Sequence, residues 1–493
     1  MRPLALTIAF LAMTLPMNAQ LTVPDLPRNP AEIKKPVSYA QVEVLVDAAR
    51  QLDRFTVREE GKSVEGRTLY SVTMKQVEVP TWEVLFIGCQ HGNEHSGKDA
   101  IAYMLWDMIE HPEKFPEDVA VHLIPNSNPD GSEADRRINS GEQDLNRDHQ
   151  HLSQPETRVM HQVVARLRPH VVVDCHEFAR DSGDYLENGW LEWPLIMMDT
   201  ANHPYLPESI YSTGKEWVHR AQPLMDAKGI NYHRYYVGGT PPHDEQRYST
   251  LDADDARNGL ATYGGLGFII EAGIQRRAED PFFDLNKRVE AYHVLLNQFL
   301  HDREMIERSI STLDKLADEQ PAEFIPTNFF WARTSTEPKM MKVIDRATGE
   351  TKELPIGNFM EDRVVKSFVP KPTGYIVHAA EAEAYATLLE HKSIPFEKLA
   401  EPLSISVEPC TLVTVEADYD ELYSRYEDRQ IVKREKAKEV EFPAGSLKIT
   451  LDGEHTRRAV ITLEPTQLYG LYQRPEWRKG TADGGILPVY RIP

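Results

Sequence analysis

Two histidines and a glutamate stand where this sequence could hold a metal ion. His91 and Glu94 are three residues apart in QHGNEHSGKDA, directly after the apolar run TWEVLFIGC, and His176 follows the run VVVDC. Two imidazoles and one carboxylate form one of the ligand sets that hold catalytic zinc, with the fourth position open to water or substrate. The pattern therefore predicts a zinc site made by His91, Glu94 and His176.

A second interpretation of the same string involves His95. HGNEH fits the pattern H-x-x-E-H, in which two histidines on one helix face bind zinc and the glutamate is the base. Gly92 and Asn93 are poor helix formers, and the preceding apolar run ends only two residues before His91. We therefore expect His95 to line the pocket or to lie behind the ligands.

A third segment could bind carboxylates. IPNSNPDGSEADRRINSGEQDLNRDH contains the turn signature NPDG and then supplies Arg136, Arg137, Asn146 and Arg147. A guanidinium group recognises a carboxylate through paired hydrogen bonds, which makes these arginines candidates for substrate binding. A solvated basic loop is the alternative.

Glu271 is a candidate base. It ends the run GGLGFIIE, which should be buried on both faces. A carboxylate there is costly unless it serves a cation or a reaction, or pairs with a nearby Arg or Lys. With a zinc site at the same edge, Glu271 is placed to activate water.

These residues need a sheet to position them. Apolar runs alternate with helical stretches from about Gln41 to Asp318, which predicts an α/β fold with a central, mainly parallel sheet and ligands beyond the carboxyl ends of its strands. The expected strands are Val84–Cys89, Val119–Ile124, His170–Cys175 and Gly267–Glu271, and the expected helices include Lys98–Glu110, Pro155–Leu167 and one over Phe283–Leu316.

The rest of the chain predicts a second, smaller domain. We divide the chain into a catalytic domain at 20–318, a linker at 319–326 and a β-rich domain at 327–493. Met340–Ile344 and Glu350–Leu354 flank DRATG, a hairpin signal in which Gly349 can take a positive φ. Further expected elements are a helix at Glu381–Glu390 and strands at Leu447–Leu451 and Ala459–Leu463.

Taken together, the motifs resemble the zinc carboxypeptidases related to carboxypeptidase A. HGNE, NPDG with the later R-x-N and D-L-N-R, the strand-end histidine and the late glutamate occur in that family's order, over roughly Gln41 to Leu300. The resemblance implies a mixed α/β sandwich and one zinc per chain, bound by His91, Glu94 and His176. It further implies that Asp144 orients His91, Arg137 stabilises the oxyanion, Asn146 and Arg147 hold the substrate's terminal carboxylate, and Glu271 is the general base.

The sequence departs from the family at several places. NRDH replaces the usual NRN followed by an aromatic residue, and HEF stands where HSY is frequent. The family's mobile tyrosine has two candidates, Tyr248 and Tyr263, of which we favour Tyr248. Arg257 lies near the expected side-chain pocket, where it would favour acidic terminal residues; a surface ion pair is the alternative.

The implied activity is hydrolysis of a C-terminal peptide bond, or of a peptide-like amide with a free C-terminal carboxylate. Three other functions remain open. A deacylase of N-acyl amino acids, like aspartoacylase or succinylglutamate desuccinylase, would share the site. A murein peptide amidase and an inactive module that binds peptide termini are the others.

Composition and the N-terminus limit the setting. The net charge of −22 argues against a nucleic-acid partner. Residues 1–19 have the charge, apolar run and small cleavage residue of a secretory signal, which predicts export to the periplasm or the extracellular space. No later run reaches about 20 apolar residues, so we expect no membrane span after cleavage. Cys89 and Cys175 are expected as buried free thiols, with a disulfide between them as the alternative.

Overall fold

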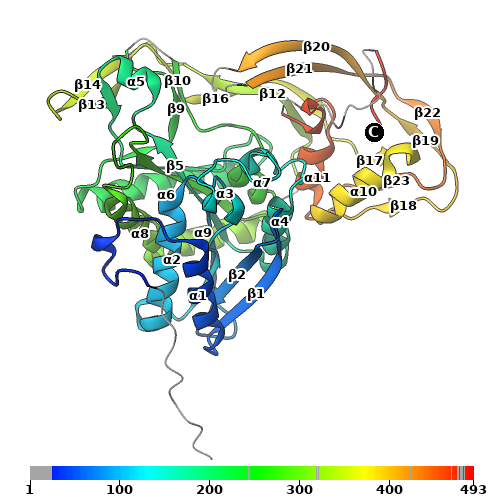
Figure 1. The fold of residues 1–493 in the computed structure, drawn as a ribbon. Coiled ribbons are helices and arrows are strands. Elements are labelled where there is room, and N and C mark those ends of the chain that lie inside the picture. The colour runs from blue at the N-terminus through cyan, green and yellow to red at the C-terminus, as the bar shows by residue number, and fades with distance from the viewer. Residues whose placement is uncertain are drawn as a thin grey trace, which may run out of the picture.

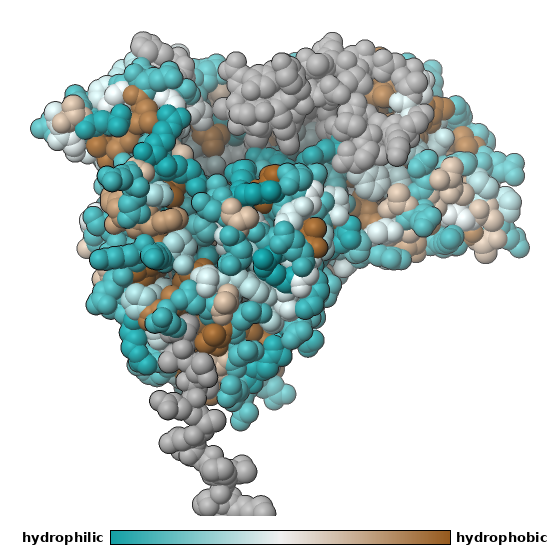
Figure 2. All heavy atoms as spheres, viewed as in Figure 1, coloured by the Kyte–Doolittle hydropathy of each residue, from teal (hydrophilic) through white to brown (hydrophobic). Residues whose placement is uncertain are grey.

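The computed structural model describes residues 25–242, 245–317, 319, 321–420, 425–467, 469–474, 477, 481 and 484–493. The expected signal segment at 1–19 lies outside the described residues, so export stays a prediction. Among the described residues no helix has the length and apolar character that crossing a membrane requires. On the face shown in Figure 2, hydrophilic residues predominate and hydrophobic ones are interspersed among them.

A central sheet forms the core of the first part of the chain (Figure 1). It has eight strands in the order β1-β2-β4-β3-β5-β11-β7-β8. The neighbours β4, β3, β5 and β11 are parallel, whereas β1, β2 and β7 are joined antiparallel to their inner neighbours. The mixed α/β fold is therefore confirmed. The strands are β1 (Phe55–Lys62), β2 (Thr68–Met74), β3 (Trp82–Gly88), β4 (Val119–Ile124), β5 (Val171–Ala179), β7 (Ile196–Thr200), β8 (Tyr232–Arg234) and β11 (Leu266–Ile274).

Helices cover both faces of this sheet. Alternate strand residues point to opposite faces, and each set packs in its own apolar cluster. One cluster includes α1 (Tyr39–Arg50), α2 (His95–Glu110), α6 (Glu208–Asp226), α8 (Leu285–His301) and α9 (Arg303–Ala317). The other includes α4 (Pro155–Leu167) and α7 (Ala256–Ala261). The short helices α3 (Pro129–Glu133) and α5 (Gly183–Glu187) lie in the connections.

The prediction of one helix over Phe283–Leu316 is wrong. The chain forms α8 and α9, separated by Asp302, whose ψ of 83° is not helical. The Asp302 carboxylate accepts the backbone N–H of Met305 at 3.3 Å and two hydrogen bonds from Arg220. Asp302 thus starts a new helix, and an amphipathic pattern that continues across the break conceals it from sequence analysis.

The later part of the chain forms several small sheets. In the order of the chain, the strands are β12 (Phe324–Ala332), β13 (Lys339–Asp345), β14 (Thr351–Ile356), β15 (Asn358–Met360), β16 (Asp362–Pro370), β17 (Gly374–Val377), β18 (Glu397–Lys398), β19 (Leu403–Val407), β20 (Cys410–Asp420), β21 (Arg425–Arg434), β22 (Lys438–Phe442), β23 (Leu447–Thr450) and β24 (Val489–Ile492). The helices are α10 (Ala382–His391) and α11 (Thr456–Leu463). The expected hairpin is confirmed as β13 and β14, with Gly349 at a φ of 74°.

The strand predicted at Ala459–Leu463 is wrong, because these residues belong to α11. All of Ala459, Val460, Ile461 and Leu463 are buried. An apolar run buried on every side looks the same in sequence whether it forms a strand or an enclosed helix.

The two parts of the chain share sheets. β13 pairs with β6 (Trp190–Glu192), and β15 pairs with β10 (Glu245–Tyr248), which in turn pairs with β9 (Tyr236–Gly238). Strands that follow residue 326 therefore complete sheets begun by loops of the first part. The division into domains at 319–326 stays a prediction.

Candidate metal and substrate site

The turn between β3 and α2 carries His91 and Glu94. Gly92 permits this turn, because a Cβ at position 92 would lie 2.0 Å from the backbone carbon of Gly131. One glycine belongs to HGNE and the other to NPDG, so their close approach holds the two motif segments together. Glu94 is the N-cap residue of α2, yet its side chain makes no capping bond. Its carboxylate is directed at the two histidines instead.

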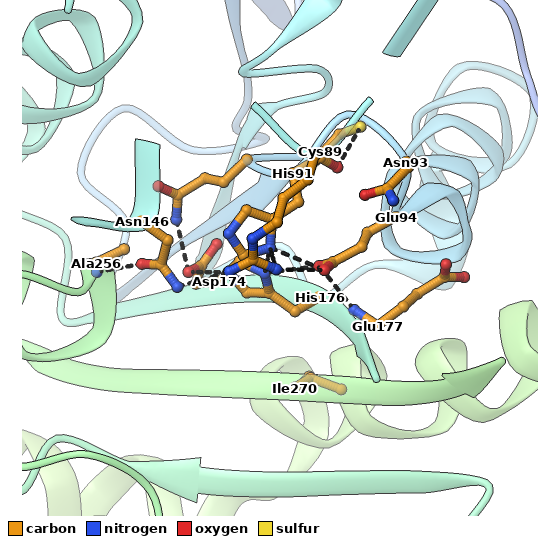
Figure 3. A network of polar contacts seen from close by, with 12 residues as sticks. Cys89, His91, Asn93, Glu94, Asn146, Asp174, His176, Glu177, Ala256 and Ile270 are labelled. Carbon is orange, nitrogen blue, oxygen red and sulfur yellow. Dashed lines mark hydrogen bonds and ion pairs between the residues drawn. The ribbon is translucent and has the colours of Figure 1, made fainter. Parts of the chain in front are cut away.

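His91, Glu94 and His176 converge on one point (Figure 3). Their potential ligand atoms all lie within 4.8 Å of one another, and all three residues are buried. The Glu94 carboxylate lies 2.8 Å from Nδ1 of His91 and 2.8 Å from Nδ1 of His176. Burial works to raise the pKa of Glu94, but the two histidines outweigh it and hold that pKa well below its ordinary value.

The donor set fits a cation. Nε2 of His91 lies 3.0 Å from the Asp144 carboxylate, and Nε2 of His176 lies 2.6 Å from Asp174. Each carboxylate accepts a hydrogen bond from Nε2–H, so a neutral ring has its lone pair at Nδ1. These Nδ1 atoms are only 3.0 Å apart. Two facing lone pairs beside a carboxylate are stabilised by a positive charge between them, and the N, O, N set suits zinc.

Strand register brings Glu271 to the same place. β5 and β11 are parallel, and Glu271 pairs with His176. β5 runs four residues and β11 three residues beyond the ends predicted for them, since the pairing continues to Ala179 and Ile274. The Glu271 carboxylate accepts a hydrogen bond from the Tyr235 hydroxyl. Burial raises the pKa of Glu271 to about 8, so this carboxylate binds a proton more readily than an exposed one.

Arg137 lies beside the three possible ligands. Its Nε and Nη2 donate to the same Asp144 carboxylate oxygen at 3.0 and 2.9 Å, and Nη1 lies 3.4 Å from Glu94. Asp144 therefore joins Arg137 to His91, because its other oxygen contacts the His91 ring. The Arg137 side chain keeps an exposed fraction of 46% and lines the cavity in front of the ligands.

A cavity of about 380 Å³ opens over these residues. Asn146 and Arg147 line it, and both lie in the short helical turn Leu145–Arg147 after Asp144. Asn146 is held in place because its Oδ1 accepts the Ala256 backbone N–H at 2.9 Å. Of the residues predicted from the motifs, His91, Glu94, Arg137, Asn146, Arg147 and Glu271 all line this cavity.

Comparison with known proteins supports the same assignment. Residues 43–180 match the sequence model of a family described as zinc carboxypeptidase. This region is therefore similar to the zinc carboxypeptidases. The matched segment contains both histidines, Glu94 and the NPDG loop, but ends before Glu271.

Proteins similar to this chain include several carboxypeptidases. Carboxypeptidase 2 of Trichophyton rubrum is 24% identical over 87% of this chain and 79% of its own length. Carboxypeptidase 2 of Trichophyton tonsurans is 25% identical over 43% of this chain, and the alignment spans only 41% of that relative. A metallo-carboxypeptidase from Burkholderia cenocepacia has a TM-score of 0.41 and 19% identity, with 57% of this chain and 70% of that chain covered.

The two candidate tyrosines, Tyr248 and Tyr263, do not line the cavity. The Tyr248 hydroxyl accepts from Lys339 at 2.6 Å, and its ring packs against Trp331. Tyr263 lies behind the sheet, where its hydroxyl contacts His161 at 3.0 Å. Tyr235 takes the place beside Glu271. It belongs to HRYYVGG, which has no motif spacing to Glu271, so sequence analysis missed it.

Arg257 and His95 also have definite positions. Arg257 lines the cavity, and its Nη2 donates to Asp255 at 2.8 Å. The pair is buried, so the surface ion pair considered above is not what forms. His95 begins α2, and its Nε2 contacts Asp135 at 3.0 Å, away from the three possible ligands. Arg136, which is adjacent to Arg137 in the sequence, pairs with the exposed Glu142.

The cysteines are free. Cys89, Cys175 and Cys410 are all buried and unpaired by disulfides. Burial raises the pKa of Cys89 to about 12, which makes it an unreactive thiol. The expectation of buried free thiols at 89 and 175 is thus confirmed.

Proposed function

We propose that this chain is a zinc-dependent carboxypeptidase, which hydrolyses the C-terminal bond of a peptide or a peptide-like amide with a free terminal carboxylate. One observation carries the proposal. Groups suited to metal binding, proton transfer and carboxylate binding, namely His91, Glu271 and Arg147, line a single cavity. A substrate with an amide next to its terminal carboxylate could contact all three groups at once.

His91, Glu94 and His176 are the residues that would hold one zinc ion per chain. When bound, zinc would supply Lewis-acid polarisation of the scissile carbonyl and would make water more acidic. Asp144 orients His91 through the ring proton at Nε2, and Arg137 keeps Asp144 in place. The match of residues 43–180 to zinc carboxypeptidases supports this choice of metal.

Glu271 acts as the general base in this proposal. It takes a proton from the attacking water and later delivers it to the leaving amine, which avoids an unstable amide anion. Arg137 donates to the oxyanion that forms at the carbonyl; one such donor is typically worth about 2.7–4 kcal/mol. Its neighbours Asp144 and Glu94 fix the guanidinium before substrate binds.

Asn146 and Arg147 bind the terminal carboxylate. They lie side by side after Asp144, and the Asn146 amide is already oriented by the Ala256 N–H. A charged hydrogen bond of this kind contributes about 1.5–3 kcal/mol. The contact makes the enzyme an exopeptidase, since a residue in the middle of a peptide has no free carboxylate to offer.

The test compares two substrates with Arg147→Ala. On a substrate with a free terminal carboxylate, kcat/KM should fall roughly ten- to 150-fold, which is the kinetic equivalent of the lost bond. On the same peptide with an amidated terminus, kcat/KM should scarcely change, because that substrate never made the contact.

Arg136→Ala is the matched control, because Arg136 is an adjacent arginine that pairs with Glu142 and does not line the cavity. It should leave kcat/KM close to wild type on both substrates. Equal losses in Arg147→Ala on the acid and the amide would rule out the exopeptidase proposal. Turnover confined to N-acyl amino acids would favour the deacylase, and turnover confined to murein peptides would favour the amidase.

A further inference from the structure

A chain of buried hydrogen bonds leads away from the metal group. It starts at His176, whose Nε2 lies 2.6 Å from Oδ2 of Asp174 (Figure 3). The same oxygen accepts Nε2 of Gln90 at 2.6 Å. Gln90 then presents its Oε1 to Nε2 of His149 at 2.9 Å. All four residues are buried, so water does not compete for these contacts.

The chain of hydrogen bonds continues behind the sheet. Nδ1 of His149 lies 3.1 Å from Nε2 of His161, and Nδ1 of His161 lies 3.0 Å from the Tyr263 hydroxyl. The hydroxyl also lies 3.2 Å from the backbone oxygen of Lys392. The contacts thus run without a gap from a possible metal ligand to a residue just after α10.

Two residues from the later part of the polypeptide, Lys392 and Arg458, contact the end of this hydrogen-bond chain that lies away from His176. Nζ of Lys392 donates to the His149 backbone oxygen at 2.7 Å. The Arg458 guanidinium stacks over the Tyr263 ring, 4.1 Å from its centroid, and its Nε donates to the Lys392 backbone oxygen at 2.6 Å. Both side chains are buried, and both make these contacts from beyond residue 326.

One arrangement of protons satisfies the contacts from Asp174 to Tyr263, and the Lys392 backbone oxygen then accepts from Arg458. Oδ2 of Asp174 accepts from Gln90, so the Gln90 oxygen faces His149 and requires a proton on Nε2 of that ring. Nδ1 of a neutral His149 must then accept from Nε2–H of His161. Nδ1 of His161 in turn accepts the Tyr263 hydroxyl proton. Burial lowers the pKa of His149 to about 4 and that of His161 well below its ordinary value, so both rings are neutral at pH 7, as the arrangement needs.

We propose that His149, His161 and Tyr263 are positioning residues that fix His176 in the tautomer with a free Nδ1, and that Lys392 and Arg458 make the C-terminal region part of this device. The proposal rests on the metal site described under the proposed function. Every donor in the chain points toward Asp174, which is thereby held as the acceptor of the Nε2 proton of His176. Asp174 oriented in this way leaves Nδ1 of His176 for the metal.

Paired substitutions at His161 test the proposal in the full-length protein. His161→Leu removes both ring contacts, whereas His161→Gln can again donate to His149 and accept from Tyr263. Outer partners of metal-binding histidines typically change metal affinity about 10- to 100-fold. In a competition assay with a chromogenic chelator, His161→Leu should weaken zinc binding at least about ten-fold, and His161→Gln should recover most of the loss.

A spectroscopic readout and a control exclude a merely structural effect. In metal-free protein labelled with ¹⁵N-histidine, the fraction of His149 in the Nε2–H tautomer should fall in His161→Leu, because Nδ1 loses its proton donor, and should recover in His161→Gln. His122→Leu is the control, since His122 is also buried and hydrogen-bonded at both ring nitrogens, to Thr73 and Glu83. It should bind zinc like the wild type.

Tyr263→Phe covers the case in which His161→Leu does not fold. It removes one hydroxyl from a buried ring, and we expect zinc binding to weaken about two- to ten-fold. Wild-type zinc affinity in folded His161→Leu or in Tyr263→Phe would overturn the positioning role and leave the proposed carboxypeptidase untouched. A wild-type protein that bound no zinc would overturn both proposals.

Discussion

The β5–β11 strand pair and the segment that carries Lys392 and Arg458 reach the same site by different means. The strand pair supplies side chains that face the cavity, His176 and Glu271, at adjacent register positions. The later segment supplies contacts to the backbone oxygens of residues 149 and 392 and to an aromatic ring. The first kind of contribution leaves a motif in the sequence. The second leaves none, because many side chains can bind a carbonyl oxygen.

This difference suggests a division of labour. Substitutions on the strand pair should remove the chemistry, whereas substitutions in the later segment should change how well the site is held. The buried cluster of Lys392, Arg458, His149 and His161 is also expensive, since burial disfavours the charged form of each group. Buried polar groups of this kind are stable only when they are hydrogen-bonded, which is the case for these four residues.

The largest effect should come from the metal ligands. His91→Ala and His176→Ala should each remove most bound zinc and nearly all activity, because a site with three protein ligands has none to spare. Metal content after dialysis measures this directly. His95→Ala should keep its zinc, since His95 contacts Asp135 instead. Full zinc occupancy in both ligand variants would end the assignment.

Glu271→Gln should come next. Glutamine keeps the shape but accepts no proton from water, so kcat should fall about 10²- to 10⁴-fold while zinc stays bound. Stopped assays on a peptide substrate, with zinc content measured in the same sample, check this expectation. A variant that kept more than roughly a tenth of wild-type kcat would show that the base is another group.

Tyr235→Phe should have an intermediate effect. It removes the hydroxyl that donates to Glu271, and we expect kcat/KM at pH 7 to fall about ten-fold. The same contact lowers the pKa of Glu271, so the acid limb of the pH profile should move to higher pH in the variant. Tyr248→Phe serves as the control, and an effect there equal to that of Tyr235→Phe would contradict the assignment.

The last prediction concerns stability and not activity. Burial lowers the pKa of Lys392 from its ordinary value of 10.5 to about 7, with Asp254, Asp148 and Arg458 as charged neighbours. Between these pH values the unfolded chain binds a proton that the folded chain does not, so raising the pH stabilises the fold, by at most about 1.4 kcal/mol per pH unit.

Urea unfolding of Lys392→Met and of the wild type from pH 6 to 10 measures this pH-dependent contribution to the free energy of unfolding. The variant has no ionisable amine at position 392. The free energy of unfolding of the wild type, relative to that of Lys392→Met, should therefore rise above about pH 7. Lys398→Met, at an exposed lysine, is the control. A flat difference for Lys392→Met would mean that the ammonium stays charged when folded.

Much of the first part of the chain could be predicted without coordinates. Val119–Ile124 and Pro155–Leu167 were expected at the bounds that the structure has, because apolar periodicity and a proline at the first helical position mark them clearly. The break at Asp302 and the helix at Thr456–Leu463 were missed. Polar contacts at Asp302, and burial at Thr456–Leu463, decide between structures that share one hydrophobic pattern.

For the site, the sequence by itself determined which residues could bind metal, because HGNE and the strand-end His176 carry that chemistry in their types and spacing. Only the tertiary structure decided that Tyr235, and neither Tyr248 nor Tyr263, lies beside Glu271, and that Lys392 and Arg458 touch residues 149 and 263. The physical reason is separation along the chain. A motif records neighbours that one turn or one strand end brings together, whereas contacts across more than a hundred residues exist only after the sheet and its later covering have packed.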